Sequence, residues 1–167
     1  MDDPHVGPDD LRKVAAAFPT GVVLLTVATT PDGYGTTVGS FVTVSLEPPL
    51  VSVCLQVGCR TLALVPPQTP FGISVLTADQ ADLAHRYSRR DRTRGLGGLP
   101  LWPGQQPGVL TLASAAAGFE CRAVRHVEVG DHVLVLASVG NAWRADATPL
   151  LHLNSRLVPA GRAHQVA

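Results

Sequence analysis

Two runs rich in β-branched and apolar residues, 41–46 and 50–56, are separated by only three residues. Their alternating pattern is typical of β-strands. Pro48 and Pro49 lie between the runs, where their fixed φ and missing N–H groups favour a rigid turn. We therefore expect a strand, a turn and a second strand over residues 41–56.

The rest of the chain contains further short strands and few helices. The other strand-like runs are 21–29, 71–76, 119–128 and 132–140, the last two forming a hairpin. Three helices are expected. The first is capped by Asp9 or Asp10 and runs to Phe18, before Pro19. The second is a short helix at 61–65, and the third, at about 79–87, is capped within Thr77–Gln80. This pattern predicts a mainly β protein and argues against a doubly wound sheet.

The segment from Ser88 to Gln106 has a different character. It is rich in arginine, glycine and proline, which predicts a long irregular loop. Such a loop is either a binding loop or lid, or an ordinary surface segment. Its arginines are Arg89, Arg90, Arg92 and Arg94, the only concentrated source of positive charge available for a pyrophosphate.

Nucleotide-binding motifs of the common kinds are absent from the sequence. Gly95-Leu96-Gly97-Gly98 lies in a polar, proline-flanked segment and opens no helix, so it is no dinucleotide fingerprint. The chain also lacks a phosphate-binding loop with Gly-Lys-Ser/Thr. Any nicotinamide cofactor is therefore bound without a Rossmann fold.

Composition predicts one soluble domain. The chain has 167 residues, 46% of them hydrophobic, which is enough for one core. We expect that domain at 9–158, between flexible ends at 1–8 and 159–167. With a formal net charge of +0 and 16% charged residues, no general field attracts nucleic acid or a membrane surface. No run approaches the roughly 18 apolar residues of a membrane span, and no signal core follows Met1, so a cytoplasmic location is expected.

The three cysteines, Cys54, Cys59 and Cys121, cannot all pair, and none lies in a Cys-x-x-Cys spacing. Free thiols in a reducing compartment are the expected state. His126, Glu128 and His132 have no zinc-like spacing, so no metal site is predicted.

Two segments have residues suited to a flat anionic ligand. Small residues before Phe41 allow close approach to the backbone, with Thr37 and Ser40 as hydrogen-bonding groups or as ordinary strand-entry residues. Arg60 and Thr61 begin a short helix, where a phosphate could bind, unless Arg60 is simply solvated.

Gly130-Asp131 is a two-residue hairpin signal that needs no functional explanation. His132 is not explained by the turn. A Ser-His-Asp triad is not expected, because neighbouring side chains on a strand point to opposite faces.

Five motifs occur in one order: Phe18-Pro19-Thr20-Gly21-Val22; Thr37, Ser40, Phe41, Val44 and Ser45; Pro48-Pro49-Leu50-Val51; Cys59-Arg60-Thr61; and Gly130-Asp131-His132. In this order they resemble the flavin reductase-like family. The resemblance implies an FMN-binding split β-barrel. The cofactor-binding residues that it implies are Thr37, Val38, Gly39, Ser40, Phe41, Ser45, Cys59, Arg60, Thr61 and His132, with His132 also beside the nicotinamide.

The resemblance further implies hydride transfer from NADH or NADPH to FMN, or to FAD, and supply of reduced flavin to a partner monooxygenase. A homodimer is implied by analogy. Two alternatives remain open: a flavin carrier or accessory subunit without reductase turnover, and a flavin- or deazaflavin-dependent oxidase on the same barrel.

The chain departs from the family pattern at several positions. Cys59 replaces a serine, and a thiol is a weaker hydrogen-bond donor than a hydroxyl. Gly39 and Ser74 replace asparagines. In place of the family's Tyr-His-Arg-Gly-Arg-Tyr, the chain has 152–157, where only Arg156 keeps its type. These departures concern nicotinamide specificity and turnover more than FMN binding.

Overall fold

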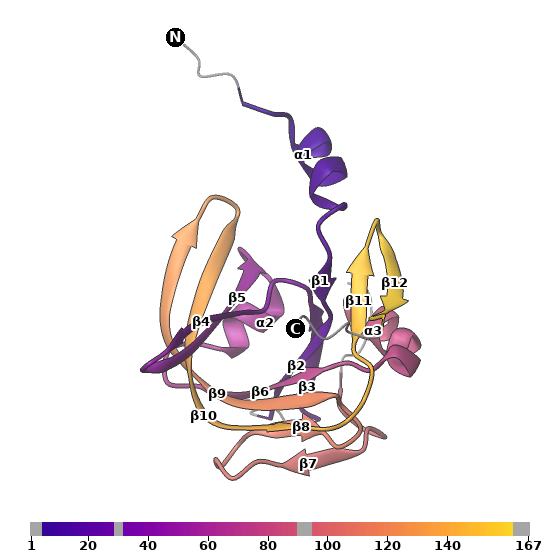
Figure 1. Ribbon diagram of the computed structural model, residues 1–167. Helices are drawn as coiled ribbons and strands as arrows, with labels where there is room; N and C mark the ends of the chain where they lie inside the picture. Colours follow the sequence, from indigo (N-terminus) through magenta and orange to yellow (C-terminus); the bar gives the residue numbers. More distant parts are fainter. Residues whose placement is uncertain (1–4, 29–31, 90–94, 162–167) are drawn as a thin grey trace.

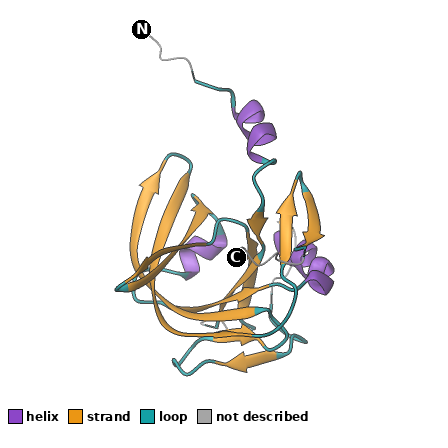
Figure 2. Cartoon of the chain, in the orientation of Figure 1, coloured by secondary structure: helices purple, strands orange, loops and turns teal. Residues whose placement is uncertain are grey.

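The computed structural model describes residues 5–28, 32–89 and 95–161. A seven-stranded antiparallel sheet, in the order β3-β2-β6-β9-β10-β5-β4, forms the curved body of the protein (Figure 1; Figure 2). Its strands are β2 (Val23–Val27), β3 (Tyr34–Val38), β4 (Val42–Leu46), β5 (Pro49–Gln56), β6 (Pro70–Val75), β9 (Ala117–Val129) and β10 (His132–Arg144).

Two small sheets and four helical segments complete the described chain. One sheet contains β1 (Thr20–Gly21), β11 (Leu150–Leu153) and β12 (Arg156–Pro159), and the other contains β7 (Leu101–Pro103) and β8 (Leu110–Leu112). The helices are α1 (Pro8–Ala15), α2 (Arg60–Leu64), the 3₁₀ turn η1 (Ala78–Gln80) and α3 (Ala81–Ser88).

The long hairpin of β9 and β10 shapes the large sheet. Each strand has 13 residues, and their pairing shifts register between Leu136 and Ala137 and again between Val139 and Asn141. Irregularities of this kind bend a strand and increase its twist. The curved sheet buries one cluster around Phe71, while a second forms around Tyr87.

The expected strands at 41–46, 50–56, 71–76, 119–128 and 132–140 are present as β4, β5, β6, β9 and β10. The capping box at Thr77 and Gln80 and the short helix after Cys59 are also present. The turn expected at the two prolines lies at residues 47–48, because Pro49 already begins β5. The fold class predicted from the sequence, mainly β with few helices, is confirmed.

The single strand expected at 21–29 is wrong, because this segment contributes to two sheets. β1 pairs with β11, whereas β2 pairs with β3 and β6. The break falls at Val22, whose N–H donates to Leu150 O and whose carbonyl accepts from Leu76 N. A change of pairing partner is a tertiary event that an uninterrupted apolar run does not reveal.

The loop expected at 88–106 is only partly irregular, because its later part includes β7, which pairs with β8. Arg90, Arg92 and Arg94 lie outside the described residues. Strands β11 and β12 were not expected either. Asn154 and Ser155, at the turn between them, have φ values of 49° and 58°.

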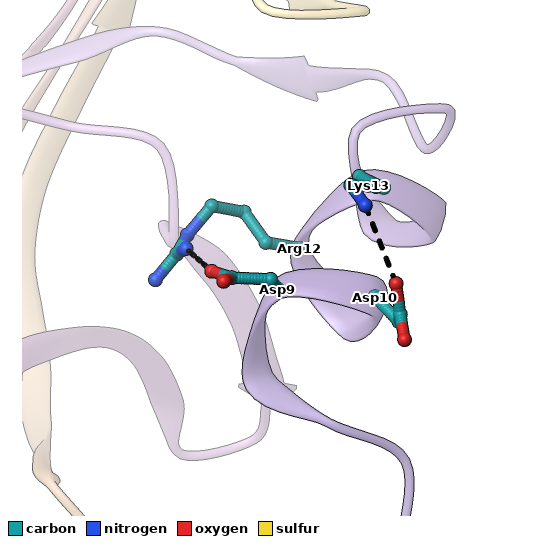
Figure 3. A network of polar contacts seen from close by, with 4 residues as sticks. All are labelled: Asp9, Asp10, Arg12 and Lys13. Atoms are coloured by element: carbon teal, nitrogen blue, oxygen red, sulfur yellow. Dashed lines mark hydrogen bonds and ion pairs between the residues drawn. The ribbon is translucent and has the colours of Figure 1, made fainter.

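The first helix differs from the prediction at both ends. It is capped by Gly7 and begins at Pro8, because Pro8 supplies the preset φ of a first helical residue. It ends at Ala15. Asp9 and Asp10 lie within its first turn. They accept from Arg12 at 2.6 Å and Lys13 at 3.4 Å, as Figure 3 shows.

The predicted apolar face of this helix does not pack on the rest of the chain. α1 stands away from the sheets (Figure 1), and none of its residues is buried. Leu11 is 56% exposed, while Val14 and, just after the helix, Phe18 are each 73% exposed. The helix therefore presents an uncovered apolar stripe.

Candidate functional site

A cavity of about 350 Å³ lies where the ends of β3 and β5 meet the start of α2. Seven of the ten site residues predicted from the sequence line it, although they come from segments far apart in the chain. They are Thr37, Val38, Gly39, Ser40, Cys59, Thr61 and His132. The remaining wall is formed by Thr36, Cys54, Leu55, Gln56 and Ser88.

The hydroxyl groups of Thr37 and Ser40 hold the cavity wall together. Thr37 Oγ1 donates to Ala84 O of α3 at 2.9 Å. Ser40 Oγ accepts from Cys54 N at 2.9 Å and donates to Cys54 O at 3.0 Å. Since both hydroxyl protons are used within the protein, a ligand meets only oxygen lone pairs at these two side chains.

Phe41, Ser45 and Arg60 do not line this cavity. Phe41 packs against the core, with its ring centroid 5.1 Å from that of Phe119. Ser45 is half-buried on β4. The guanidinium carbon of the exposed Arg60 lies 5.0 Å from the ring centroid of Tyr34, within cation–π range.

Cys59 caps α2 in the position where the family pattern has serine. Its Sγ accepts from Leu62 N at 3.4 Å, so the thiol performs a capping role that a hydroxyl usually performs. Thr61, in the first turn of α2, is buried and faces the cavity. The segment at 37–40 and the start of α2, the two segments selected from the sequence, therefore line the same cavity.

The expectation that Asp131 and His132 point to opposite faces of a strand is wrong. Asp131 belongs to the turn and not to β10, so its side chain bends back, and His132 Nδ1–H donates to Asp131 Oδ1 at 2.7 Å. This hydrogen bond, together with the charge of His132, holds the pKa of the Asp131 carboxyl below its ordinary value. The carboxylate thereby orients the imidazole at the cavity rim.

A Ser-His-Asp triad is nevertheless not formed. The two serines that line the cavity both donate to backbone carbonyls, Ser40 to Cys54 O and Ser88 to His85 O. Neither hydroxyl donates to His132, so the site lacks an activated serine.

Sequence reasoning missed the contribution of β5 to the cavity. His132 at the start of β10 lies opposite Gln56 at the end of β5, which brings residues 54–56 to the site. The only signal in the sequence was the position of these residues just before the Cys59 segment. β5 and β10 are far apart in the sequence, so their pairing depends on the assembly of the whole sheet.

The described residues contain no candidate metal-binding cluster, and burial disfavours ionisation of the Cys121 thiol. No group of three or more His, Cys, Asp or Glu side chains is placed to hold a metal ion there. Burial, with a smaller effect of nearby Glu120, raises the pKa of the Cys121 thiol to about 12. Within the same ranges, no helix is long and apolar enough to cross a membrane.

The curved antiparallel sheet, with a polar cavity at its strand ends, defines a mainly β protein. Residues 15–161 match the model of the flavin reductase like domain. The chain belongs to the flavin reductase-like family.

Three relatives illustrate the similarity. The chain is 35% identical over 150 residues to the NADH-dependent FMN reductase AsuE2 of Streptomyces nodosus subsp. asukaensis, covering 87% of this chain and 81% of the relative. It resembles the Streptomyces globisporus NADH:FAD oxidoreductase SgcE6, solved with NAD and FAD fragments, with a TM-score of 0.81, 31% identity and 99% coverage of both chains. The styrene monooxygenase flavin reductase of Pseudomonas putida S12 has a TM-score of 0.82 and 32% identity, covering 93% of this chain and 99% of that one.

Proposed function

We propose that the protein is an NAD(P)H-dependent flavin reductase that transfers hydride from NADH or NADPH to FMN or FAD. The observation that carries this proposal is the convergence of seven predicted site residues on one cavity. The names of the related reductases agree with it, and the styrene monooxygenase reductase supports a partner monooxygenase as the recipient of reduced flavin.

The residues of the cavity fit a flavin. Its volume of about 350 Å³ falls in the usual range of ligand sites, roughly 300–1,000 Å³. Gly39 contributes only backbone to the wall, and a Cβ added there would lie 3.2 Å from Thr20 Oγ1. The space beside the Gly39 Cα is therefore filled by β1, and Gly39 presents only backbone to the cavity.

Each wall would have a separate role in this function. The flavin, when bound, supplies the electron-accepting chemistry, and the protein supplies position and electrostatics. Residues 37–40 would hold the polar edge of the ring, while Cys59 and Thr61, which line the cavity at the start of α2, would hold the phosphate. His132, oriented by Asp131, would position the nicotinamide.

The test is a flavin-dependent NADH oxidation assay on the purified protein with FMN, FAD and riboflavin added separately, repeated with NADPH. Reductase activity requires loss of NADH or NADPH absorbance together with flavin reduction. Binding of flavin without any reduction by either nicotinamide would support the alternative, a flavin carrier. Reduction without release of flavin would favour the oxidase alternative.

Replacing His132 by Ala should lower the reductase rate about tenfold, which corresponds to loss of one hydrogen bond of about 1.4 kcal/mol. FMN affinity should stay within a few-fold, because the phosphate and ring contacts remain. Stopped-flow reduction and flavin fluorescence titration measure the two quantities. Asp131→Asn is the matched control, because it keeps the imidazole and removes only its charged anchor. Equal loss of rate and affinity with a lower Tm would assign His132 to hairpin packing instead.

We also propose that the protein acts as a homodimer. Exposed apolar side chains lie on α1 and on β4, the edge strand of the large sheet, where Val42, Val44 and Leu46 are exposed. Exposed apolar surface of this extent is typical of an interface. Light scattering should give about twice the mass of 17.5 kDa, and Leu46→Glu should shift it toward the monomer. A monomeric wild-type protein would contradict the proposal.

A further inference from the structure

A cavity of about 420 Å³ lies between the β7–β8 hairpin and the paired residues Glu120 of β9 and Asn141 of β10. We call it the outer cavity. It shares no lining residue with the cavity of the candidate functional site. In Figure 1 the β7–β8 hairpin lies below β9 and β10, away from α2. The proposed flavin reaction therefore gives the outer cavity no role.

Two tryptophan side chains line the outer cavity from different elements. Trp102 belongs to β7 and Trp143 to β10, and their ring centroids are 5.4 Å apart with the ring planes at 56°. Trp102 is 53% exposed, although burial of so large an apolar ring would be favourable. The pair therefore offers indole faces to a ligand that enters the cavity.

The outer cavity is also lined by a buried carboxylate. Glu120 is only 3% exposed, and its three hydrogen-bond donors, Gln105 N, Gln106 N and Asn141 Nδ2, are all neutral. Burial raises the pKa of this carboxyl, but the hydrogen bonds outweigh that effect and leave the pKa below its ordinary value. Glu120 therefore carries a negative charge at neutral pH.

This charge has no positive partner in the part of the chain that the structure describes. No lysine, arginine or histidine there forms an ion pair with Glu120, and none lines the outer cavity. Buried charges in proteins are usually balanced by an opposite charge. A ligand with a positive charge would supply that balance.

We propose that the outer cavity binds a small organic cation, whose ammonium group lies between the Glu120 carboxylate and the faces of Trp102 and Trp143. A cation over an indole face is attracted by the ring quadrupole, most strongly where water is excluded. A metal ion fits less well, because Glu120 is the only carboxylate that lines the cavity and hard cations need several oxygen ligands. The inference concerns a site separate from the flavin reaction.

Tryptophan fluorescence reports on this site directly, because the chain has two tryptophans and both line the outer cavity. The protein is titrated at constant ionic strength with choline and, separately, with n-butylammonium. The matched neutral probe is 3,3-dimethyl-1-butanol, the uncharged carbon analogue of choline. At least one cation should change the emission saturably, and the alcohol should bind about tenfold more weakly or not at all.

Glu120→Gln and Trp102→Ala should each raise the Kd of the bound cation about tenfold. Calorimetric titration gives Kd for both variants, and Tm checks that they fold. Glu128→Gln is the matched control, because it removes a carboxylate from an exposed residue of the same strand outside the cavity.

Three results would overturn the inference: no saturable change with either cation, equal affinity for choline and its neutral analogue, or an unchanged Kd in either Glu120→Gln or Trp102→Ala. None of them bears on flavin reduction. Failure of the protein to reduce flavin would contradict the proposed function and leave this inference intact.

Discussion

Gly72→Ala should destabilise the protein by about 3 kcal/mol or more, among the largest effects expected of any single methyl group added to this chain. Gly72 lies within β6, between β2 and β9, and β8 crosses its open side. An added Cβ would overlap the carbonyl oxygen of Leu110 and lie 2.6 Å from Thr26 Oγ1. The obstruction is backbone, which cannot rotate away as a flexible side chain can.

The same substitution would also break a buried hydrogen bond. The hydroxyl of Thr26, which is fully buried, donates to Leu110 O and joins β2 to β8. Separating β8 from the sheet leaves that hydroxyl with only its longer hydrogen bond to Gly72 O at 3.4 Å, at a cost of about 1 kcal/mol. Thermal unfolding should show a fall in Tm of about 6–12 °C for 3 kcal/mol at this chain length.

Gly21→Ala is the matched control for Gly72→Ala. Gly21 also lies in a strand, but an added Cβ there meets nothing within 4 Å. Its Tm should change little. Equal Tm values for Gly72→Ala and the wild type would show that β8 does not cross β6 as described.

Glu120→Ala should cost about 3 kcal/mol, the second large effect. Glu120 is only 3% exposed, and its carboxylate accepts from Gln105 N at 3.0 Å, Gln106 N at 2.7 Å and Asn141 Nδ2 at 2.8 Å. It thereby ties the segment after β7 to β9 and β10. Removing the carboxylate takes away the acceptor of all three donors. Hydrogen bonds to a charged group contribute about 1.5–3 kcal/mol each, and the cost of burying the carboxylate offsets part of their sum.

The charge of Glu120 can be tested separately from its shape. Burial raises the pKa of Glu120, but the hydrogen bonds from Asn141, Gln106 and Gln105 outweigh this and leave it below its ordinary value. A lowered pKa in the folded state means that the stabilisation is present at neutral pH. It is lost as the pH falls from about 4.3, the value in the unfolded chain, through the folded-state pKa.

Glu120→Gln is the matched variant, because it keeps the side-chain shape and one carbonyl acceptor. Its urea unfolding free energy should lie between those of Glu120→Ala and the wild type at pH 7. The gap between wild type and Glu120→Gln should shrink below pH 4. A gap that does not change with pH would show that the carboxylate charge contributes nothing.

The candidate site shows how far the sequence reaches. Thr37 to Ser40 and the Cys59 segment could be identified because their order and spacing are local properties that match a family pattern. Phe41 and Ser45 belong to the same pattern but do not line the cavity, because each contributes to packing or to the edge strand. A motif therefore marks a segment of chain and does not say which of its side chains face a ligand.

The partners of individual side chains lay beyond the sequence. Ser40 donates to Cys54 O and Thr37 to Ala84 O, contacts across 14 and 47 residues of sequence. No pattern in the sequence marks Glu120, although its carboxylate accepts three hydrogen bonds in the described part of the chain. Such contacts depend on where other strands and helices pack. Local composition does not determine those positions.

The sequence by itself determined the mainly β class, the β9–β10 hairpin, the capping box at Thr77 and the helix start after Cys59. All of these depend on backbone preferences and side chains within a few residues of one another. Only the tertiary structure decided that β1 leaves the large sheet to join β11, that β5 pairs with β10 beside His132, and that the β7–β8 hairpin forms the outer cavity with β9 and β10. The physical reason is that strands distant in sequence pair so as to bury the apolar faces of the entire sheet together, and this free energy belongs to the whole chain and to no single segment of it.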